Sequence, residues 1–102
     1  MIAMKTYFVY IVQCSDGSYY AGISNDADRR IAEHNLGLDT HCYTYLRRPV
    51  ELVYSAEFRD PNDAIRWEKQ IKGWSRVKKA ALIAGDYVEL TRLAREWRPK
   101  KN

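Results

Sequence analysis

Hydrophobic positions within residues 6–34 form two runs of aromatic and β-branched residues followed by a helical stripe, which predicts a strand, a tight turn, a second strand and a helix. Between the two runs lies Ser15-Asp16-Gly17, where a glycine accepts the positive φ of a hairpin loop. A two-residue loop would place Tyr10 and Tyr20 on opposite faces of the sheet. A three-residue loop with Gly17 in the left-handed region would place them on one face. The sequence leaves both loops open, although a glycine at the third position suits the second.

The helix predicted next begins with Asn25 as its N-cap, with Asp28 three residues later in a box-like position, and ends near Gly37. Its inward stripe is Ala27, Arg30, Ile31 and His34, so two polar side chains should face the sheet, while Arg29 and Glu33 should face outward.

Alternation over residues 50–58 predicts a third strand that places Val50, Leu52, Tyr54, Ala56 and Phe58 on the face toward the core. Three further helices are predicted. The first begins at Asp60-Pro61 and ends at Gly73, the second begins at Ser75 and ends at Gly85, and the last begins with a capping box of Asp86 and Glu89. In the second of these helices Val77, Ala80, Ala81 and Ala84 should pack inward and Lys78 and Lys79 outward; in the last, Leu90, Leu93, Ala94 and Trp97 should close the core. The fold class is therefore α/β in the mixed sense (α+β), a three-stranded antiparallel sheet flanked by helices.

The helix after Pro61 carries an acidic residue on its apolar stripe, which reads Ala64, Trp67, Glu68 and Ile71. A buried carboxylate destabilises a fold unless it is paired or bound to a cation. The residues alone leave three partners open for Glu68: Lys72 one turn later, Arg30, or a metal ion.

Length and composition indicate one domain over residues 1–97 with a basic tail at 98–102, since the chain has 102 residues of which 46% are hydrophobic. We expect a cytoplasmic protein, because the N-terminus is too short and strand-like for a signal peptide and no apolar run could span a membrane. Cys14 and Cys42 are expected to be free thiols, and no paired-cysteine spacing supports a zinc site made from them with His34 and His41.

Positive charge is concentrated in residues 66–79, which hold six basic and one acidic side chain, while residues 1–65 carry a net charge of −3. Such a segment is typical of a polyanion partner, and the plainer alternative is a solvated lysine-rich helix. The loop before Pro49 interleaves Tyr43 and Tyr45 with arginines, which suits stacking on bases, although packing of one tyrosine under the loop is equally expected. The candidate nucleic-acid contacts are Arg47, Arg48, Lys69, Lys72, Arg76, Lys78 and Lys79.

Several of these residues resemble the GIY-YIG nuclease domain in its small stand-alone bacterial form. Phe8-Val9-Tyr10 is similar to the first motif and Tyr20-Ala21-Gly22 to the second, and Arg30 falls where the family carries its catalytic arginine. His34 matches the histidine or tyrosine one turn later, and residues 64–72 are similar to the helix that supplies the metal-binding glutamate, here Glu68. The resemblance covers residues 5–84. It departs at Phe8, Val9 and Ala21, and the asparagine that some members carry after the glutamate has no counterpart except Asn102.

The resemblance implies a divalent-metal-dependent endonuclease that hydrolyses DNA phosphodiester bonds, with a role in DNA repair or in the processing of structured DNA. Glu68 would be the sole protein ligand of Mg²⁺ or Mn²⁺, and Arg30 would stabilise charge on the phosphoryl group. Tyr10 would position or deprotonate the attacking water, with Tyr20 and His34 orienting water and phosphate and His34 as the alternative proton acceptor. The alternative function is a nucleic-acid-binding module that cuts nothing, and RNA is the alternative substrate. The sequence indicates no oligomeric state.

Overall fold

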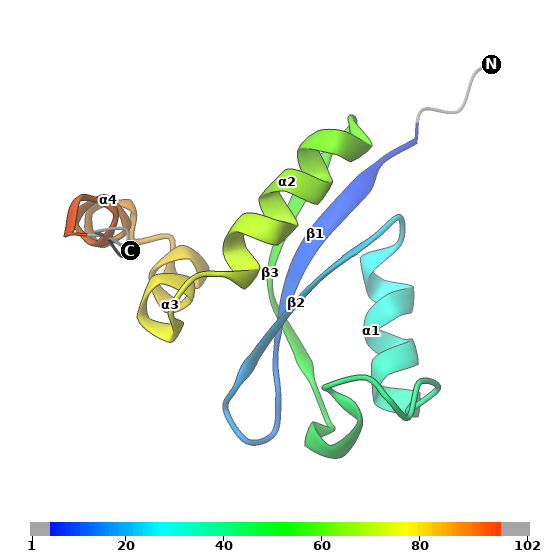
Figure 1. Cartoon of the computed structure of the whole chain (residues 1–102). Helices are drawn as coiled ribbons and strands as arrows, with labels where there is room; N and C mark the ends of the chain where they lie inside the picture. The colour runs from blue at the N-terminus through cyan, green and yellow to red at the C-terminus, as the bar shows by residue number, and fades with distance from the viewer. Residues whose placement is uncertain (1–4, 97–102) are drawn as a thin grey trace, which may run out of the picture.

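The computed structural model describes residues 5–96, and these form three strands, four α-helices and one 3₁₀ helix (Figure 1). In chain order they are β1 (Tyr7–Gln13), β2 (Tyr19–Ser24), α1 (Ala27–Leu36), η1 (Tyr45–Arg47), β3 (Glu51–Phe58), α2 (Pro61–Lys72), α3 (Arg76–Ala84) and α4 (Tyr87–Glu96). The predicted mixed α/β class with a three-stranded antiparallel sheet is confirmed. No helix in the described part of the chain is both long and apolar enough to cross a membrane.

The hairpin between β1 and β2 has the three-residue loop. The backbone N–H of Cys14 donates to the carbonyl of Ser18 at 2.8 Å, and Gly17 has a φ of 84°. A residue with a Cβ would be strained at this φ, which explains the glycine. The register therefore places Tyr10 opposite Gly22 and Val12 opposite Tyr20, so Tyr10 and Tyr20 share one face of the sheet.

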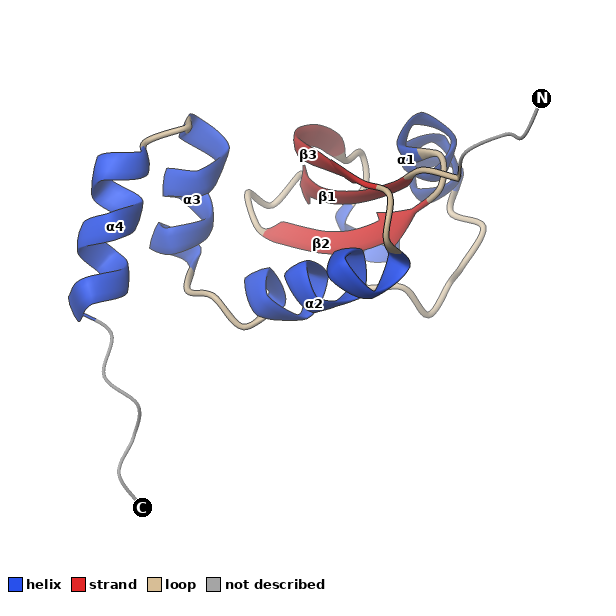
Figure 2. Cartoon of the chain, turned by 90° about the horizontal axis from the view of Figure 1, so that it is seen from above, coloured by secondary structure: helices blue, strands red, loops and turns tan. Residues whose placement is uncertain are grey.

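The sheet has the order β2-β1-β3, and each of its faces is covered by a different helix (Figure 2). On one face Val9 and Ile11 pack with Ala64 and Ile71 of α2, and all four are completely buried. On the other face Tyr10 and Val12 pack near Ile31 of α1. Alternate residues of β1 thus point to two separate hydrophobic clusters, and the strand is buried on both sides.

A β-bulge in β3 corrects the predicted alternation of that strand. Tyr54 pairs with Ile11 and Leu52 pairs with Val12, so Val53 is the extra residue. Leu52 consequently packs on the α1 face with Val50, whereas Val53 and Tyr54 pack on the α2 face. The expectation that residues 50, 52, 54, 56 and 58 share one face was wrong.

Helix α1 begins one residue later than predicted, because Asp26 and not Asn25 is its N-cap. The Asp26 carboxylate accepts the backbone N–H of Arg29 at 3.0 Å, so the predicted box between Asn25 and Asp28 does not form. Asn25 instead accepts a hydrogen bond from the Arg29 side chain. Gly37 ends the helix at a φ of 68°, as predicted.

Helices α3 and α4 extend from one end of α2 (Figures 1 and 2). The predicted caps Asp60, Ser75 and Asp86 each accept a backbone N–H, and Gly85 ends α3. The predicted inward and outward faces of these helices were partly wrong. In α3, Ala81 and Leu82 are buried, but Val77 and Ala84, which were predicted to pack inward, are exposed. Lys78 and Lys79, which were predicted to face outward, are half-buried, and Ala94 of α4 is exposed. Glu89 pairs with Arg92 rather than closing a capping box. Trp97 and the tail 98–102 lie outside the described residues.

Candidate active site

The two tyrosines of the predicted site lie next to each other on the α1 face because a glycine leaves room between them. Tyr10 is almost fully buried, and its ring crosses over Gly22 on β2. A Cβ at Gly22 would lie only 2.4 Å from the Tyr10 hydroxyl oxygen, so any larger residue there would displace the ring. Gly22 therefore has a steric role, which Tyr20-Ala21-Gly22 as a motif did not reveal.

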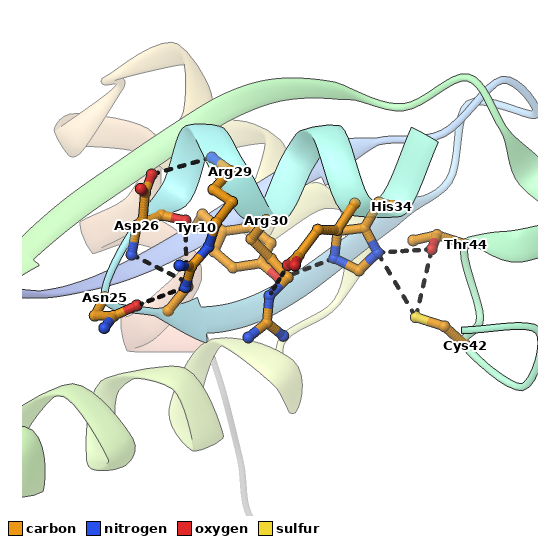
Figure 3. Close-up of polar contacts among 10 residues, drawn as sticks. Tyr10, Asn25, Asp26, Arg29, Arg30, His34, Cys42 and Thr44 are labelled. Carbon is orange, nitrogen blue, oxygen red and sulfur yellow. Dashed lines mark hydrogen bonds and ion pairs between the residues drawn. The ribbon is translucent and has the colours of Figure 1, made fainter. Parts of the chain in front are cut away.

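Helix α1 brings His34 against Tyr10 (Figure 3) and also against Tyr20. Nε2 of His34 lies 3.0 Å from the Tyr10 hydroxyl oxygen. The rings of Tyr20 and His34 meet edge to face with centroids 5.5 Å apart. The polar stripe predicted for this helix is thus oriented toward the sheet. His34 is in direct contact with both Tyr10 and Tyr20.

The loop that follows α1 adds two residues that sequence reasoning did not assign to the site. The hydroxyl oxygen of Thr44 lies 2.9 Å from Nδ1 of His34, and the Thr44 hydroxyl donates to Sγ of Cys42 at 3.4 Å (Figure 3). Thr44 is 1% exposed, so this hydroxyl is fully removed from water. Threonines in a polar loop carry no periodic signal, which is why the sequence could not distinguish Thr44 from Thr40.

A cavity of about 260 Å³ opens beside His34 and is lined by Tyr20, Arg30, Glu33, His34, Leu38, Asp39, Cys42 and Thr44. Glu33 was expected to face solvent but instead contributes to this wall, with its carboxylate oxygen 3.2 Å from Nε of Arg30. Nε of Arg30 is buried and makes no hydrogen bond of good geometry. The Arg30 side chain as a whole is 43% exposed and lines the cavity, so its guanidinium is accessible to an anion there.

Burial sets the protonation states of the three aromatic groups. It raises the pKa of the Tyr10 hydroxyl well above the ordinary value, and Tyr20 adds to the effect. It also raises the pKa of Tyr20 to about 12. The pKa of His34 is lowered, first by burial and then by the charge of Arg30. At neutral pH both tyrosines are therefore hydroxyls and His34 is a neutral imidazole that can accept a proton.

Cys14 and Cys42 are both free thiols, as predicted. Burial alone would raise the pKa of the Cys42 thiol, but hydrogen bonds from the hydroxyl and backbone of Thr44 and from Tyr20 outweigh it and bring the pKa below its ordinary value. No group of three or more histidine, cysteine, aspartate or glutamate side chains within residues 5–96 could hold a metal ion.

Glu68 lies on α2, which covers the opposite face of the sheet from α1. Its side chain is only 15% exposed and forms an ion pair with Lys72 at 3.0 Å. Its partner Lys72 lies 5.9 Å from the centroid of the Tyr20 ring, so the ion pair borders the tyrosine side of the site. One carboxylate suits Mg²⁺, which keeps most of its waters and takes its other ligands from phosphate. Glu68 is thus the carboxylate that the family resemblance assigns to the metal, and in this structure it is paired with Lys72.

The two arginines of the 43–48 loop fold onto the tyrosines of that loop. The guanidinium of Arg47 lies 3.7 Å above the Tyr43 ring and pairs with Asp16 at 3.1 Å. Arg48 lies 4.4 Å from the Tyr45 ring. The Tyr43 ring in turn runs nearly parallel to Tyr20, with an interplanar angle of 10° and centroids 6.1 Å apart. Both guanidinium groups thus pack on tyrosine rings of this loop, and Arg47 also links the loop to the β1–β2 hairpin through Asp16.

The basic residues of α2 and α3 that were predicted to contact nucleic acid lie beside the Tyr20–Tyr43 ring pair and along the helices that follow it. Lys72 and Lys79 line an open groove with Tyr19, Tyr20 and Tyr43. Arg76 lies over the Tyr19 ring and donates to the carbonyl of Gly17, and Lys78 lies over Trp74. Lys69 is exposed.

The fold and this site define a nuclease-type hydrolase domain. A family model described as the GIY-YIG catalytic domain matches residues 6–80, and the chain belongs to the GIY-YIG family. The match implies a nucleic acid substrate. The resemblance recognised in the motifs is thereby confirmed.

Among its relatives is a UPF0213 protein of Staphylococcus aureus, which is 45% identical over 80 residues, covering 78% of this chain and 96% of the relative. Two solution NMR structures are also similar. UPF0213 protein BH0048 from Bacillus halodurans has 42% identity and a TM-score of 0.52, with coverage of 78% of this chain and 83% of that one. Protein EF2693 from E. faecalis has 30% identity and a TM-score of 0.55 over both complete chains.

Proposed function

We propose that this protein is a divalent-metal-dependent endonuclease that hydrolyses phosphodiester bonds in DNA. The observation that carries the proposal is the hydrogen bond between Tyr10 and His34 beside a cavity that also presents Arg30. His34 and Arg30 line this cavity as a neutral base and a permanent cation, and the Tyr10 hydroxyl contacts His34, so the groups that phosphodiester hydrolysis uses lie together. The family match supports the reaction class.

Tyr10 and His34 act together as the proton acceptor for the attacking water. The raised pKa of Tyr10 makes a free phenolate scarce. Its hydroxyl can instead take the proton of the water while passing its own proton to Nε2 of His34, 3.0 Å away. The water oxygen then forms the new bond to phosphorus, and the bond to the leaving oxygen breaks. His34 ends the step as an imidazolium and returns its proton to solvent.

Arg30 and a metal ion held by Glu68 would stabilise the negative charge that develops in this step. The Arg30 guanidinium, which lines the cavity, would bind the non-bridging phosphoryl oxygens as charge accumulates on them. Glu68 would hold Mg²⁺, or Mn²⁺ in its place, which when bound supplies the positive charge that stabilises the leaving oxygen. Lys72 would then lose its ion-pair partner and become available to the DNA backbone.

A non-catalytic nucleic-acid-binding module is the second candidate, and the ion pair between Glu68 and Lys72 favours it, since a satisfied carboxylate needs no metal. A cleavage assay separates the two. Purified protein is incubated with duplex, single-stranded, flap and branched DNA, and with RNA of the same sequence, in Mg²⁺, Mn²⁺ or EDTA. Cleavage of one or more DNAs with metal and none with EDTA is expected; binding without cleavage in any arm would establish the module.

A further inference from the structure

The Thr44 hydroxyl lies between Nδ1 of His34 and Sγ of Cys42, and the direction of its hydrogen bears on which nitrogen of His34 carries the proton. A hydroxyl has a single hydrogen, and that of Thr44 is donated to Sγ of Cys42 at 3.4 Å. Towards Nδ1 of His34, 2.9 Å away, the same oxygen can then only accept. With the Thr44 hydrogen on the Cys42 side, Nδ1 would carry the hydrogen of the neutral imidazole.

Nε2 is then left with its lone pair, and that lone pair faces Tyr10. The hydroxyl of Tyr10 lies 3.0 Å from Nε2, and in this tautomer it would donate to it. The four groups form one chain in which each donor meets an acceptor: Tyr10 to His34, His34 to Thr44, and Thr44 to Cys42. The opposite tautomer would place N–H at Nε2, where it could accept no proton from Tyr10.

We propose that Thr44 is a positioning residue that holds His34 in the Nδ1–H tautomer, with Cys42 holding the Thr44 hydroxyl in turn, so that Nε2 is free to accept the proton relayed by Tyr10. The role of this tautomer in catalysis rests on the proposed nuclease function. The tautomer itself does not, because it is a property of the folded protein without substrate.

Burial supports the assignment. Thr44 is 1% exposed, so water does not compete for its hydroxyl. Cys42, the partner of the Thr44 hydroxyl, is itself held in place, because its Sγ also accepts hydrogen bonds from the backbone N–H of Thr44 and from the Tyr20 hydroxyl. A buried group whose partners are all satisfied has one low-energy orientation.

The tautomer is measured by long-range ¹H–¹⁵N correlation NMR, which distinguishes Nδ1–H from Nε2–H. The chain has two histidines, and a His41→Gln variant assigns the signals. The parent protein is expected to show Nδ1–H at His34. Thr44→Val, which keeps the shape but removes the acceptor, should shift the population toward Nε2–H, whereas Thr44→Ser should retain Nδ1–H.

Two further variants keep the test interpretable. Cys42→Ala leaves Thr44 in place but frees its hydroxyl to turn toward Nδ1, so a mixture of tautomers is expected even if Thr44→Val does not fold. Thr40→Val changes an exposed threonine of the same loop and should leave the tautomer and the activity unchanged.

Activity provides the second readout, measured on whichever DNA the parent cleaves. Thr44→Val should lower kcat by about tenfold to a hundredfold with little change in KM, as loss of a group that orients a proton acceptor does, and Thr44→Ser should restore it. The pH dependence of kcat is recorded for each variant, because titratable and charged groups surround His34. These groups are Tyr10, Tyr20, Arg30, Glu33, Asp39 and Cys42. The profile of Thr44→Val should change relative to the parent and that of Thr40→Val should not.

Nε2–H at His34 in the parent protein would overturn the proposal, as would a Thr44→Val protein that keeps Nδ1–H and the parental kcat. A parent protein that shows Nδ1–H, loses it in Thr44→Val and cleaves nothing would support the assignment of Thr44 and contradict only the nuclease function.

Discussion

At the scale of single residues, the site depends on the contact between the Tyr10 hydroxyl and Nε2 of His34 and on the position of Arg30 at the cavity. The motif spacing and the helical stripe made Tyr10, Tyr20, Arg30 and His34 candidates, but the sequence left open whether Tyr10 and Tyr20 share a face, which follows from the three-residue loop. Thr44 was not predictable, because its contact with His34 depends on the path of an irregular loop. The partner of Glu68 was left open, and the structure pairs it with Lys72 in the absence of metal.

Arg30→Lys should bind DNA but lose about 100-fold to 1,000-fold in kcat, the usual cost of removing one transition-state donor. Lysine keeps the charge but lacks the planar fork that meets two phosphoryl oxygens. Cleavage rates and DNA affinity are compared with those of Arg29→Lys, an exposed neighbour that contacts Asn25 and should behave like the parent. Parental cleavage by Arg30→Lys would remove it from the catalytic machinery.

The lowered pKa of His34 predicts a pH dependence of both stability and rate. Because the folded protein disfavours the imidazolium, the stabilising contribution of neutral His34 is complete above the unfolded pKa of about 6.5 and is lost as pH falls through that value toward the folded pKa. The cleavage rate, which needs neutral His34, should rise with pH to a plateau with a midpoint below about 6.5.

Thermal unfolding of His34→Gln between about pH 5 and pH 8 checks the stability part, since this range spans the ordinary histidine pKa. Its melting temperature should depend less on pH than that of the parent. His41→Gln, which alters an exposed histidine, should keep the parental dependence. Equal pH dependence in the parent and His34→Gln would show that other groups are responsible.

At the scale of elements, the hairpin and the helix after it build the site, and the bulge in β3 shows where prediction from sequence ended. The caps of α2 and α3 and the glycine ends were predictable, since short-range hydrogen bonds determine them. The bulge at Val53 was not, because every residue from Val50 to Phe58 except the two glutamates and one serine is apolar, and the alternating pattern holds equally well without it. The extra residue follows from pairing with β1, which is a long-range property.

Gly22→Ala tests the β1–β2 element. The added Cβ would lie 2.4 Å from the Tyr10 hydroxyl oxygen, so the buried ring must move away from His34. We expect a loss of about 1–3 kcal/mol of stability, the usual cost of overpacking, together with a fall in kcat. Gly73→Ala is the control, because the nearest atom to its Cβ lies 3.6 Å away. Chemical denaturation and cleavage are measured on both; a stable, fully active Gly22→Ala would mean that the ring position is unimportant.

At the scale of the whole molecule, the basic segment 66–79 lies beside the candidate site. Residues 66–79 form most of α2 and the start of α3, and their lysines reach the groove beside Tyr20 and Tyr43. The charge distribution was readable from the sequence, but its position next to the site was not, because it depends on α2 packing across β1 and β2. DNA that enters the site would therefore run along this segment, held by its phosphates.

DNA affinity should fall steeply with salt, and the triple variant Lys69→Gln, Lys78→Gln, Lys79→Gln should reduce the slope of log K against log salt by up to about 3. Glutamine keeps the stem of Lys78 over Trp74, and Lys72 is left intact because its removal would also unpair Glu68. The control is Lys5→Gln with Arg59→Gln, two exposed cations that flank β1 and β3 at the opposite end of the sheet. An unchanged slope in the triple variant would place the DNA elsewhere.

The central claim, metal-dependent cleavage at this site, is tested most directly by the cleavage rate of Glu68→Gln in Mg²⁺, measured beside the parent in Mg²⁺ and in EDTA. Glutamine keeps the size of the side chain but is a far poorer ligand for Mg²⁺. The parent should cleave in Mg²⁺ but not in EDTA, and a folded Glu68→Gln protein should cleave in neither and should lose the Mg²⁺-induced rise in melting temperature. A Glu68→Gln protein that cleaves at the parental rate would contradict this claim.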